Sequence, residues 1–277
     1  MRLTASLVLY NNLAPMLEAA MDAFLSGCEG LLVVADNSPA PLTSPAFERA
    51  RVRYAHMGAN LGFGRAHNRA FAAVADESDA HLIMNPDIVF GPEVLPHLVD
   101  VLARRPEVGA IMPQVRYPGG ELQRVAKLLP TPIDVFARRF SPVKCWRESI
   151  NDRYELRALP QTRAVETPTL SGCFLMVRSA LFADLGGFDP RYFMYMEDFD
   201  LVRRIGDRAV TLYDPAVAVE HEHGRGSYRS RVLLKAHIRS AVAYFNKWGW
   251  AFDSTRTLRN AAMLARMVEE LRRDKAR

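Results

Sequence analysis

One short segment of the chain concentrates groups that can transfer a proton and bind an anion. Residues 196–204 read Met-Glu-Asp-Phe-Asp-Leu-Val-Arg-Arg, which places Glu197, Asp198 and Asp200 just ahead of Arg204. If a helix begins near Glu197, Asp198 lies in its first turn, where the helix dipole favours negative charge. This combination suits an enzyme that deprotonates one group and holds a phosphate on another. The competing interpretation is an acidic helix start followed by a solvated basic turn.

A second candidate site is the end of an apolar run. Residues 80–84 are typical of a buried strand, and Asn85-Pro86-Asp87 follows directly. Proline fixes its own φ, removes a donor and restricts the residue before it, so the strand must end there. Ligands bind at the carboxyl ends of strands in open α/β sheets, and a carboxylate there suits Mg²⁺ or Mn²⁺. The alternative is a turn in which Asp87 caps the next helix.

A third element combines histidines with glycines. After the apolar run 216–219, the chain carries His221, His223, Gly224 and Ser227 within seven residues. In an extended chain the side-chain period is two, so both histidines lie on one side. Glycines allow the backbone to approach a phosphate closely. The alternative is a glycine-rich loop with exposed histidines, and a structural zinc site is disfavoured because no CxxC pair accompanies it.

Further short motifs lie between and before these sites. They are Tyr10-Asn11 and Asp36-Asn37 after two strand-like runs, Asn60, Gly62 and Asn68 around a glycine loop, Ser171-Gly172 through Arg178, and Gly186-Gly187-Phe188-Asp189. Together the motifs resemble the inverting nucleotide-sugar glycosyltransferases of glycosyltransferase family 2, and most of all their bacterial rhamnosyltransferase-like branch. That branch often carries Asn-Pro-Asp where other members have Asp-x-Asp.

The resemblance covers residues 3–250 and implies an α/β GT-A fold. A mostly parallel central sheet would be flanked by helices, with further helices at the C-terminus. Three features depart from the pattern. Position 85 is not an aspartate, His223 leaves the choice of site histidine open, and Gly224 and Ser227 are one residue further apart than the pattern has them.

The resemblance also implies an inverting transfer from a nucleoside-diphosphate sugar. Asp198 would be the general base that takes a proton from the acceptor hydroxyl. Asp87 and His221 would hold Mg²⁺ or Mn²⁺ against the donor diphosphate, and Arg204 would add a cationic contact. The favoured donor is dTDP-L-rhamnose, with UDP-sugars as the alternative. The acceptor would be a bacterial surface glycan such as an O-antigen, on a lipid carrier or a lipopolysaccharide core.

The remaining site residues divide between donor and acceptor. On the acceptor side, Glu197, Asp200 and Gly172 would orient the acceptor and the helix. Asp36 would accept the N3–H of uracil or thymine. The donor or nucleotide would contact Tyr10, Asn11, Asp36, Asn37, Asn60, Gly62, Asn68, Asn85 and Arg204.

Composition limits the class of protein. The chain has 277 residues, 49% of them hydrophobic, which is ample for a core. Its net charge of +5 is uneven, since residues 225–277 hold 13 Lys and Arg against 4 Asp and Glu, a net +9. This basic tail suggests an anionic partner surface, such as the inner leaflet of the cytoplasmic membrane; no nucleic-acid partner is expected. A solvated face is the alternative. Three distant cysteines fit a reducing cytoplasm, and no 18-residue apolar stretch suggests a membrane span.

Hydrophobic periodicity predicts how the chain is organised. Strands are expected at 3–9, 30–35, 52–56, 81–84 and 109–112, and helices at 13–26, 64–75, 93–103, 230–248 and 255–275. Within a 1–250 glycosyltransferase domain we distinguish a nucleotide-binding half (1–115), a variable acceptor-side insertion (116–166) and a catalytic half (167–229). A basic helical segment (230–277) follows.

Two other functional classes compete with a transferase. A non-catalytic nucleotide-sugar-binding protein would explain the missing first aspartate, but the intact Glu197-Asp198 pair argues against it. A metal-dependent hydrolase built on His221 and His223 would need a further ligand cluster. The glycine loop at 60–67 does not predict a dinucleotide site, because His67 occupies the third glycine position.

Overall fold

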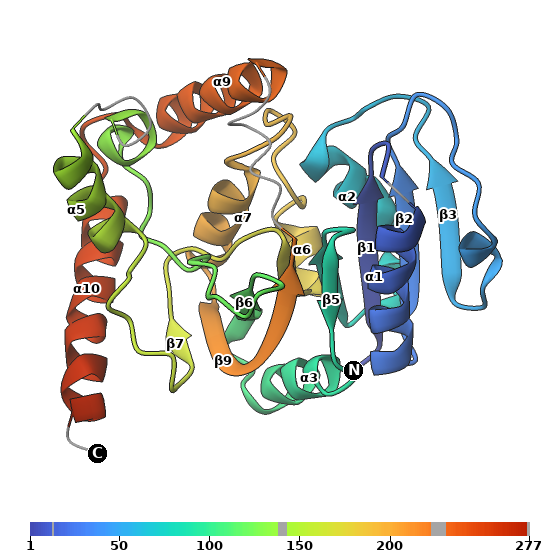
Figure 1. Ribbon diagram of the computed structural model, residues 1–277, viewed down its shortest axis with the longest axis horizontal. Coiled ribbons are helices and arrows are strands. Elements are labelled where there is room, and N and C mark those ends of the chain that lie inside the picture. Colours follow the sequence, from blue (N-terminus) through green and yellow to red (C-terminus); the bar gives the residue numbers. More distant parts are fainter. Residues whose placement is uncertain (13, 138–142, 223–230, 276–277) are drawn as a thin grey trace.

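The computed structural model describes residues 1–12, 14–137, 143–222 and 231–275 (Figure 1). The first half of the chain alternates strands with helices. Its strands are β1 (Leu3–Leu9), β2 (Leu31–Asp36), β3 (Val52–His56) and β4 (Ala80–Met84). Its helical elements are α1 (Ala14–Gly27), η1 (Pro45–Glu48), α2 (Phe63–Ala72) and η2 (Ala75–Glu77). β1 pairs in parallel with β2 and β4, and β2 with β3, as the alternation predicts.

Strand β2 shows why both faces of this sheet are covered. Its side chains alternate, so Leu32 and Val34 join the same buried cluster as the core residues of α1. Val33 and Ala35 point the other way and pack with α2. The strand therefore reads as one continuous apolar run rather than as an alternating pattern.

The second half of the chain turns the sheet into a mixed one. Its elements are β5 (Ile88–Phe90), α3 (Val94–Arg104), β6 (Val108–Arg116), β7 (Val165–Glu166), β8 (Phe174–Arg178), α6 (Ser179–Asp184), α7 (Glu197–Ile205) and β9 (Val210–His221). Within the described residues the strand order is β3-β2-β1-β4-β8-β6-β9-β5, with β7 on β9. β8 runs antiparallel to both β4 and β6, whereas β6 and β9 are parallel. The antiparallel pairing of β8 with its two neighbours was not predicted.

The remaining elements cover one end of the sheet (Figure 1). They are the π-helical turn η3 (Ile133–Ala137), α5 (Lys144–Tyr154), α9 (Arg231–Trp248) and α10 (Ser254–Lys275). Met263 of α10 packs with Leu128 and Tyr154 in one buried cluster. Phe245 of α9 packs with Tyr192 in another. Both C-terminal helices thus share hydrophobic clusters with the body of the protein, and the two predicted helices are present within one residue of their expected ends.

None of the helices in the described part of the chain combines the length and the apolar character that a membrane crossing requires.

Candidate active site

A large cavity opens where β8 and β9 meet the start of α7. Its volume is about 1140 Å³. Ligand pockets commonly measure roughly 300–1,000 Å³, so this one has room for more than one small molecule. The walls come from segments distant in sequence: 117–127, 147–157, 169–173 and 194–199, together with Phe63, Asn85, His221 and His237.

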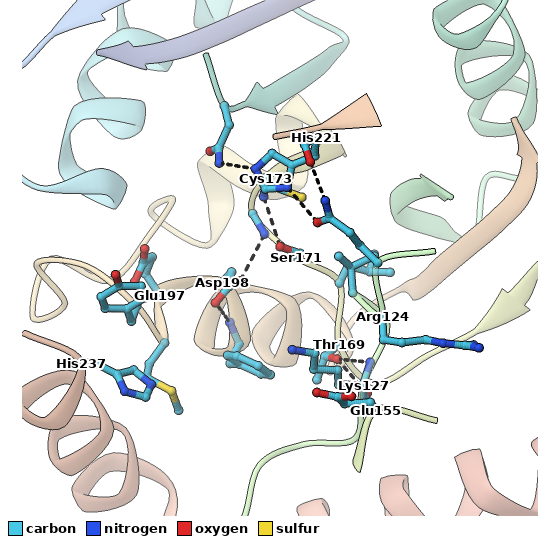
Figure 2. A pocket seen from close by; sticks show the side chains of 18 of the residues that line it. Arg124, Lys127, Glu155, Thr169, Ser171, Cys173, Glu197, Asp198, His221 and His237 are labelled. Atoms are coloured by element: carbon cyan, nitrogen blue, oxygen red, sulfur yellow. Dashed lines mark hydrogen bonds between the residues drawn. The ribbon is translucent and has the colours of Figure 1, made fainter. Parts of the chain in front are cut away.

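The start of α7 projects Asp198 into this cavity (Figure 2). Tyr195 and Met196, the two residues before the helix, both have φ of 69°. This is a left-handed backbone conformation that residues other than glycine rarely adopt. Such strain is typical of functional sites. The Gly172 N–H donates to Asp198 Oδ2 at 3.2 Å, and the Phe199 N–H donates to Oδ1 at 2.9 Å. Asp198 remains partly exposed to the cavity.

Glu197 lies beside Asp198 and is buried. Its Oε2 has no hydrogen-bond partner among the described residues. Burial, followed by the neighbouring Asp198 charge, raises the pKa of Glu197 to about 8. Burial also raises the pKa of Asp198, although the N–H groups of Gly172 and Phe199 oppose the effect. Near neutral pH the pair therefore holds its proton on Glu197 and its negative charge on Asp198, because burial and the Asp198 charge outweigh the backbone hydrogen bonds that act to lower the pKa of Glu197.

The Asn85-Pro86-Asp87 turn meets the end of β9. His221 Nε2 lies 3.3 Å from Asp87 Oδ1 and 3.3 Å from Asn85 Nδ2. Burial acts to lower the pKa of His221, but its contacts with Asp87 and Cys173 outweigh that effect and raise it to about 10. Asp87 Oδ1 is buried and makes no hydrogen bond within the described chain.

Gln123 fixes the orientation of this histidine. Its Oε1 lies 3.0 Å from His221 Nδ1, and its side-chain amide donates to the His221 carbonyl. The sequence analysis missed Gln123 because 98 residues separate the two partners. A histidine held through one ring nitrogen presents the other in a fixed direction, as metal-ligating histidines commonly do. His223, Gly224 and Ser227 lie outside the described residues.

The described residues contain no cluster of three or more His, Cys, Asp or Glu side chains placed to hold a metal. Any ion at this edge would thus take two protein side chains, Asp87 and His221, and the rest of its ligands from elsewhere. Asp87 Oδ1 and His221 Nε2 are adjacent, and they fit such a partial site once the ring releases its proton, as metal binding requires of a histidine ligand.

The predicted nucleotide residues form a loop framework at the carboxyl ends of β1 and β2. Asp36 is fully buried and accepts from the Ser38 N–H, the Leu42 N–H and the Tyr54 hydroxyl. Burial opposes ionisation of Asp36, but these three donors lower its pKa overall. Direct contact of this carboxylate with a base is therefore not what the structure indicates. Asp36 organises the loop instead.

Neighbouring residues of this framework differ in how accessible they are. Asn37 is buried and donates from Nδ2 to the Gly62 carbonyl at 3.0 Å. Tyr10 and Asn11 are exposed, and Asn11 adopts a φ of 54°. Asn60 is also exposed and accepts the Gly62 N–H at 3.0 Å. Within this framework, the three exposed side chains of Tyr10, Asn11 and Asn60 have surface to offer a ligand.

Gly62 and Asn68 connect this framework to the 187–196 loop. Gly62 has a φ of 82°, and a Cβ atom there would lie 2.1 Å from the Phe193 carbonyl oxygen. The side chain of Asn68 accepts the Phe188 N–H and donates to the Phe188 carbonyl, both at 2.8 Å. Both ends of the Asn68 amide are thus engaged by the backbone, and its contact with the donor stays a prediction.

Asp200 and Arg204 also differ from their predicted roles. Asp200 is fully buried and accepts from Trp248 Nε1 at 2.8 Å and from Arg204 Nε at 2.8 Å, while Lys247 Nζ lies 2.6 Å from Oδ1. Arg204 donates its remaining N–H groups to the Leu185 and Gly187 carbonyls. Neither residue lines the cavity. Both fasten α7 to its surroundings, so we withdraw the acceptor and diphosphate contacts predicted for them.

Three further ionisable side chains around Asp198, those of Lys127, Glu155 and His237, were not singled out from the sequence. Figure 2 shows Glu197 and His237 on one side of Asp198, with Lys127 and Glu155 on the other. The charge of Lys127 opposes the rise in the Asp198 pKa. His237 comes from α9 and the other two from the 116–166 segment, so nothing in their sequence spacing indicates a shared site.

The matching family model accounts for these motifs. Residues 7–186 match the model described as Glycosyl transferase family 2. The chain belongs to glycosyltransferase family 2. A curated relative from Mycobacterium tuberculosis, named N-acetylglucosaminyl-diphospho-decaprenol L-rhamnosyltransferase, is 31% identical over 88% of this chain and 86% of its own length. Rhamnosyltransferase WbbL from Escherichia coli is 26% identical over 68% of this chain and 71% of its own. The protein is therefore a glycosyltransferase of the rhamnosyltransferase-like branch, as predicted.

Solved structures confirm the GT-A fold. The mannosyltransferase PcManGT from Pyrobaculum calidifontis, in complex with GDP-Man and Mn²⁺, superposes with a TM-score of 0.58 at 18% identity. The match covers 88% of this chain and 64% of that one. Residues 1–349 of S. aureus TarS in complex with UDP give a TM-score of 0.58 at 14% identity, covering 89% of this family 2 chain and 66% of TarS.

Proposed function

We propose that this glycosyltransferase moves L-rhamnose from dTDP-L-rhamnose to a hydroxyl group of a lipid-linked glycan, with inversion at the anomeric carbon. The observation that carries the proposal is Asp198, a partly exposed carboxylate that reaches a cavity of about 1140 Å³ from a strained helix start. The curated relatives are named rhamnosyltransferases, which supports the choice of sugar.

In this mechanism Asp198 accepts the proton of the attacking hydroxyl. Its raised pKa makes it a stronger base than an ordinary aspartate, and its contacts with the Gly172 and Phe199 N–H groups hold it in one orientation. General-base assistance of this kind typically contributes about 10²–10⁴-fold to the rate. Glu197 is protonated near neutral pH, so it can donate a hydrogen bond to the acceptor while Asp198 accepts one.

The donor diphosphate would lie at the sheet edge formed by Asn85, Asp87 and His221. Asp87 and His221 would hold a divalent cation there, because their side chains are adjacent and Gln123 orients the His221 ring, which would release its proton to the solvent on binding. When bound, such a cation neutralises charge on the leaving diphosphate. Gln123 would keep the His221 ring in place, and Asn85 would present its side-chain amide to the same edge.

The acceptor would enter from the side lined by the 116–166 segment. The M. tuberculosis relative takes its name from an N-acetylglucosaminyl-diphospho-decaprenol acceptor. A diphosphate-linked acceptor is anionic, and the wall on this side carries Arg124, Lys127 and Arg147. This charge supports an acceptor of the same chemical class, with a sugar hydroxyl near Asp198 and its phosphates near the basic wall.

Substitution of Asp198 by Asn tests the base assignment. We expect Asp198→Asn to lower turnover by about 10²–10⁴-fold while dTDP still raises the thermal midpoint. The measurements are sugar transfer from dTDP-L-rhamnose and thermal shifts with dTDP and UDP, each with and without Mn²⁺. Asp207→Asn, an exposed change just after α7, is the matched control and should retain full activity.

Three outcomes would change the proposal. More than about a tenth of wild-type turnover in Asp198→Asn would rule out its role as base. A shift with UDP alone would keep the family and change the donor. Equal shifts with and without metal, and unaltered by Asp87→Ala, would remove the cation from the mechanism.

A further inference from the structure

Helix α5 separates the active-site cavity from a second hollow. Arg147, Asn151 and Glu155, spaced by four residues, line the large cavity. Ser149, Ile150 and Arg153 line a hollow of about 600 Å³ on the other side. Residues three and four apart share a helix face, so α5 presents one face to each space. Whatever binds the outer face of α5 is therefore one helix away from the acceptor side of the active site.

The segments that line this second hollow also carry exposed apolar side chains. We call them the α5 corner surface: Ile133 of η3, Val143 and Trp146 at the start of α5, and Trp250 and Phe252 between α9 and α10. Phe252 is 96% exposed, Trp146 46% and Trp250 42%. Ile133 and Trp250 both line the hollow. Trp146 belongs to the same face of α5 as Ile150 and Arg153, because it precedes them by four and seven residues.

Two positively charged side chains are exposed at the α5 corner surface. Lys144 and Arg153 are exposed and flank Trp146 along α5. The two carboxylates between them, Glu148 and Asp152, are both paired with Arg157. Asp134 at the rim is buried and accepts from Thr131. An approaching anionic surface would thus meet two cations and an apolar centre.

The basic helix α10 is less suited to that role than its composition predicts. Arg259 pairs with Asp207, Arg266 with Glu166, and Arg273 with Glu269 and Glu270. Arg256 is buried and donates to backbone carbonyl groups. Four of the five arginines of α10 are therefore engaged within the protein, whereas the α5 corner surface combines two exposed cations with exposed aromatic rings.

We propose that the α5 corner surface docks on an anionic lipid bilayer, with Trp146, Trp250 and Phe252 entering the interfacial layer. Tryptophan favours that layer because its ring is apolar and its N–H is polar, and lysine or arginine beside it pairs with anionic headgroups. The proposal rests on the proposed function in one respect. An acceptor with a lipid anchor would leave the cavity at the bilayer, and α5 borders both.

Vesicle binding tests this docking without any need for catalysis. The full chain is sedimented with phosphatidylcholine vesicles, with and without phosphatidylglycerol. We expect binding to the anionic vesicles, and at least about a tenfold weaker affinity for Trp146→Ser/Phe252→Ser, which corresponds to the loss of two interfacial anchors. The matched control is Leu258→Ser, an exposed apolar residue on α10, which should bind like the wild type.

Lipids brominated in the upper acyl chain provide a second measurement. They should quench the wild-type tryptophan fluorescence, and Trp146→Phe/Trp250→Phe should lose that quenching while it still binds. Equal vesicle binding by the Trp146→Ser/Phe252→Ser variant, or equal loss in Leu258→Ser, would overturn the proposal. So would a wild-type dimer that this double variant converts to a monomer with no change in vesicle binding, because a second copy would then be the occupant.

The docking proposal and the proposed function can fail independently of each other. Asp198→Asn should sediment with vesicles like the wild type even though it has lost turnover. If the wild type transfers rhamnose and ignores vesicles, only the docking proposal fails. If it binds vesicles but no nucleotide changes its thermal midpoint, only the proposed function fails.

Discussion

Two adjacent carboxylates in this protein have different protonation states because their surroundings differ. Asp198 receives two backbone N–H groups and faces the cavity, whereas Glu197 is buried with one oxygen unpartnered in the described chain. A single negative charge is therefore placed on the residue that can reach an acceptor. The resemblance assigned the general base to Asp198 and an orienting role to Glu197, but their different protonation states could not be predicted, since both residues fall in the same helix turn.

The protonation of Glu197 predicts a pH-dependent stability. Its pKa of about 8 in the folded state exceeds its ordinary value of 4.5, so the native state binds a proton that the unfolded chain has lost. Stability must then fall as pH rises through that window and level off above it. We expect Glu197→Gln to remove at least about 1 kcal/mol of this loss between pH 5 and 8.

Urea unfolding of both proteins at several pH values measures this difference. The quantity of interest is the slope of the unfolding free energy against pH in the wild type minus the same slope in the variant. In this difference the contributions of titrating groups away from Glu197 cancel. Identical slopes would mean that Glu197 ionises normally, and the division of roles within the pair would have to be abandoned.

At the scale of the element, α7 directs its carboxylates to different environments. Asp198 points to the cavity, while Asp200 is surrounded by Arg204, Lys247 and Trp248. We expect Asp200→Ala to lower the free energy of unfolding by about 3–5 kcal/mol, because it removes the fully buried carboxylate that Arg204, Lys247 and Trp248 share. Asp198→Ala should change it by less than about 1 kcal/mol, since burial already disfavours that charge.

Chemical denaturation of the two variants gives the comparison directly. Each replaces an aspartate in the first turns of one helix by alanine, so helix propensity cancels between them. A larger loss for Asp198→Ala than for Asp200→Ala would reverse the structural and catalytic roles assigned here.

Local patterns predicted most elements and misassigned some side chains. The strands of the first half were predicted within one or two residues, because each is a short apolar run that ends in a turn signal. Asp200 and Arg204 are four residues apart, a spacing that favours an ion pair along one helix face. The resemblance to the glycosyltransferase family led instead to the prediction that Arg204 contacts the donor diphosphate. Gln123 could not be found, since its role depends on a contact with His221 that only the folded sheet creates.

At the scale of the whole molecule, the cavity depends on segments that no local pattern joins. Its walls combine a glycine-containing turn before β8, the start of α7, the end of β9, α5 and one residue of α9. The sequence predicted the 116–166 segment as an acceptor-side insertion, and Lys127, Arg147 and Glu155 of that segment do line the cavity. The C-terminal helices matter to the site as well, because His237 belongs to α9.

A buried ion pair fastens those C-terminal helices to the catalytic part. Arg203 of α7 donates to both oxygens of Asp253 at 2.6 and 2.7 Å, and its guanidinium lies 4.1 Å from the Trp248 ring. Both charged side chains are 3% exposed. We expect Asp253→Ala to lower the free energy of unfolding by about 3–5 kcal/mol, because it leaves the buried Arg203 without its carboxylate partner. Asp207→Ala, which breaks the more exposed pair with Arg259, should cost about 1 kcal/mol or less.

The cooperativity of unfolding tests whether the C-terminal helices belong to the same folding unit as the body of the protein. Since α9 and α10 share hydrophobic clusters with the body of the protein, the far-UV and near-UV circular dichroism of Asp253→Ala should fall together at a lower temperature. The near-UV signal reports on Trp248 and Trp250, which adjoin the broken pair. Its loss ahead of the far-UV signal would show that the C-terminal helices unfold independently, and they would then be a separate unit rather than one wall of the active site.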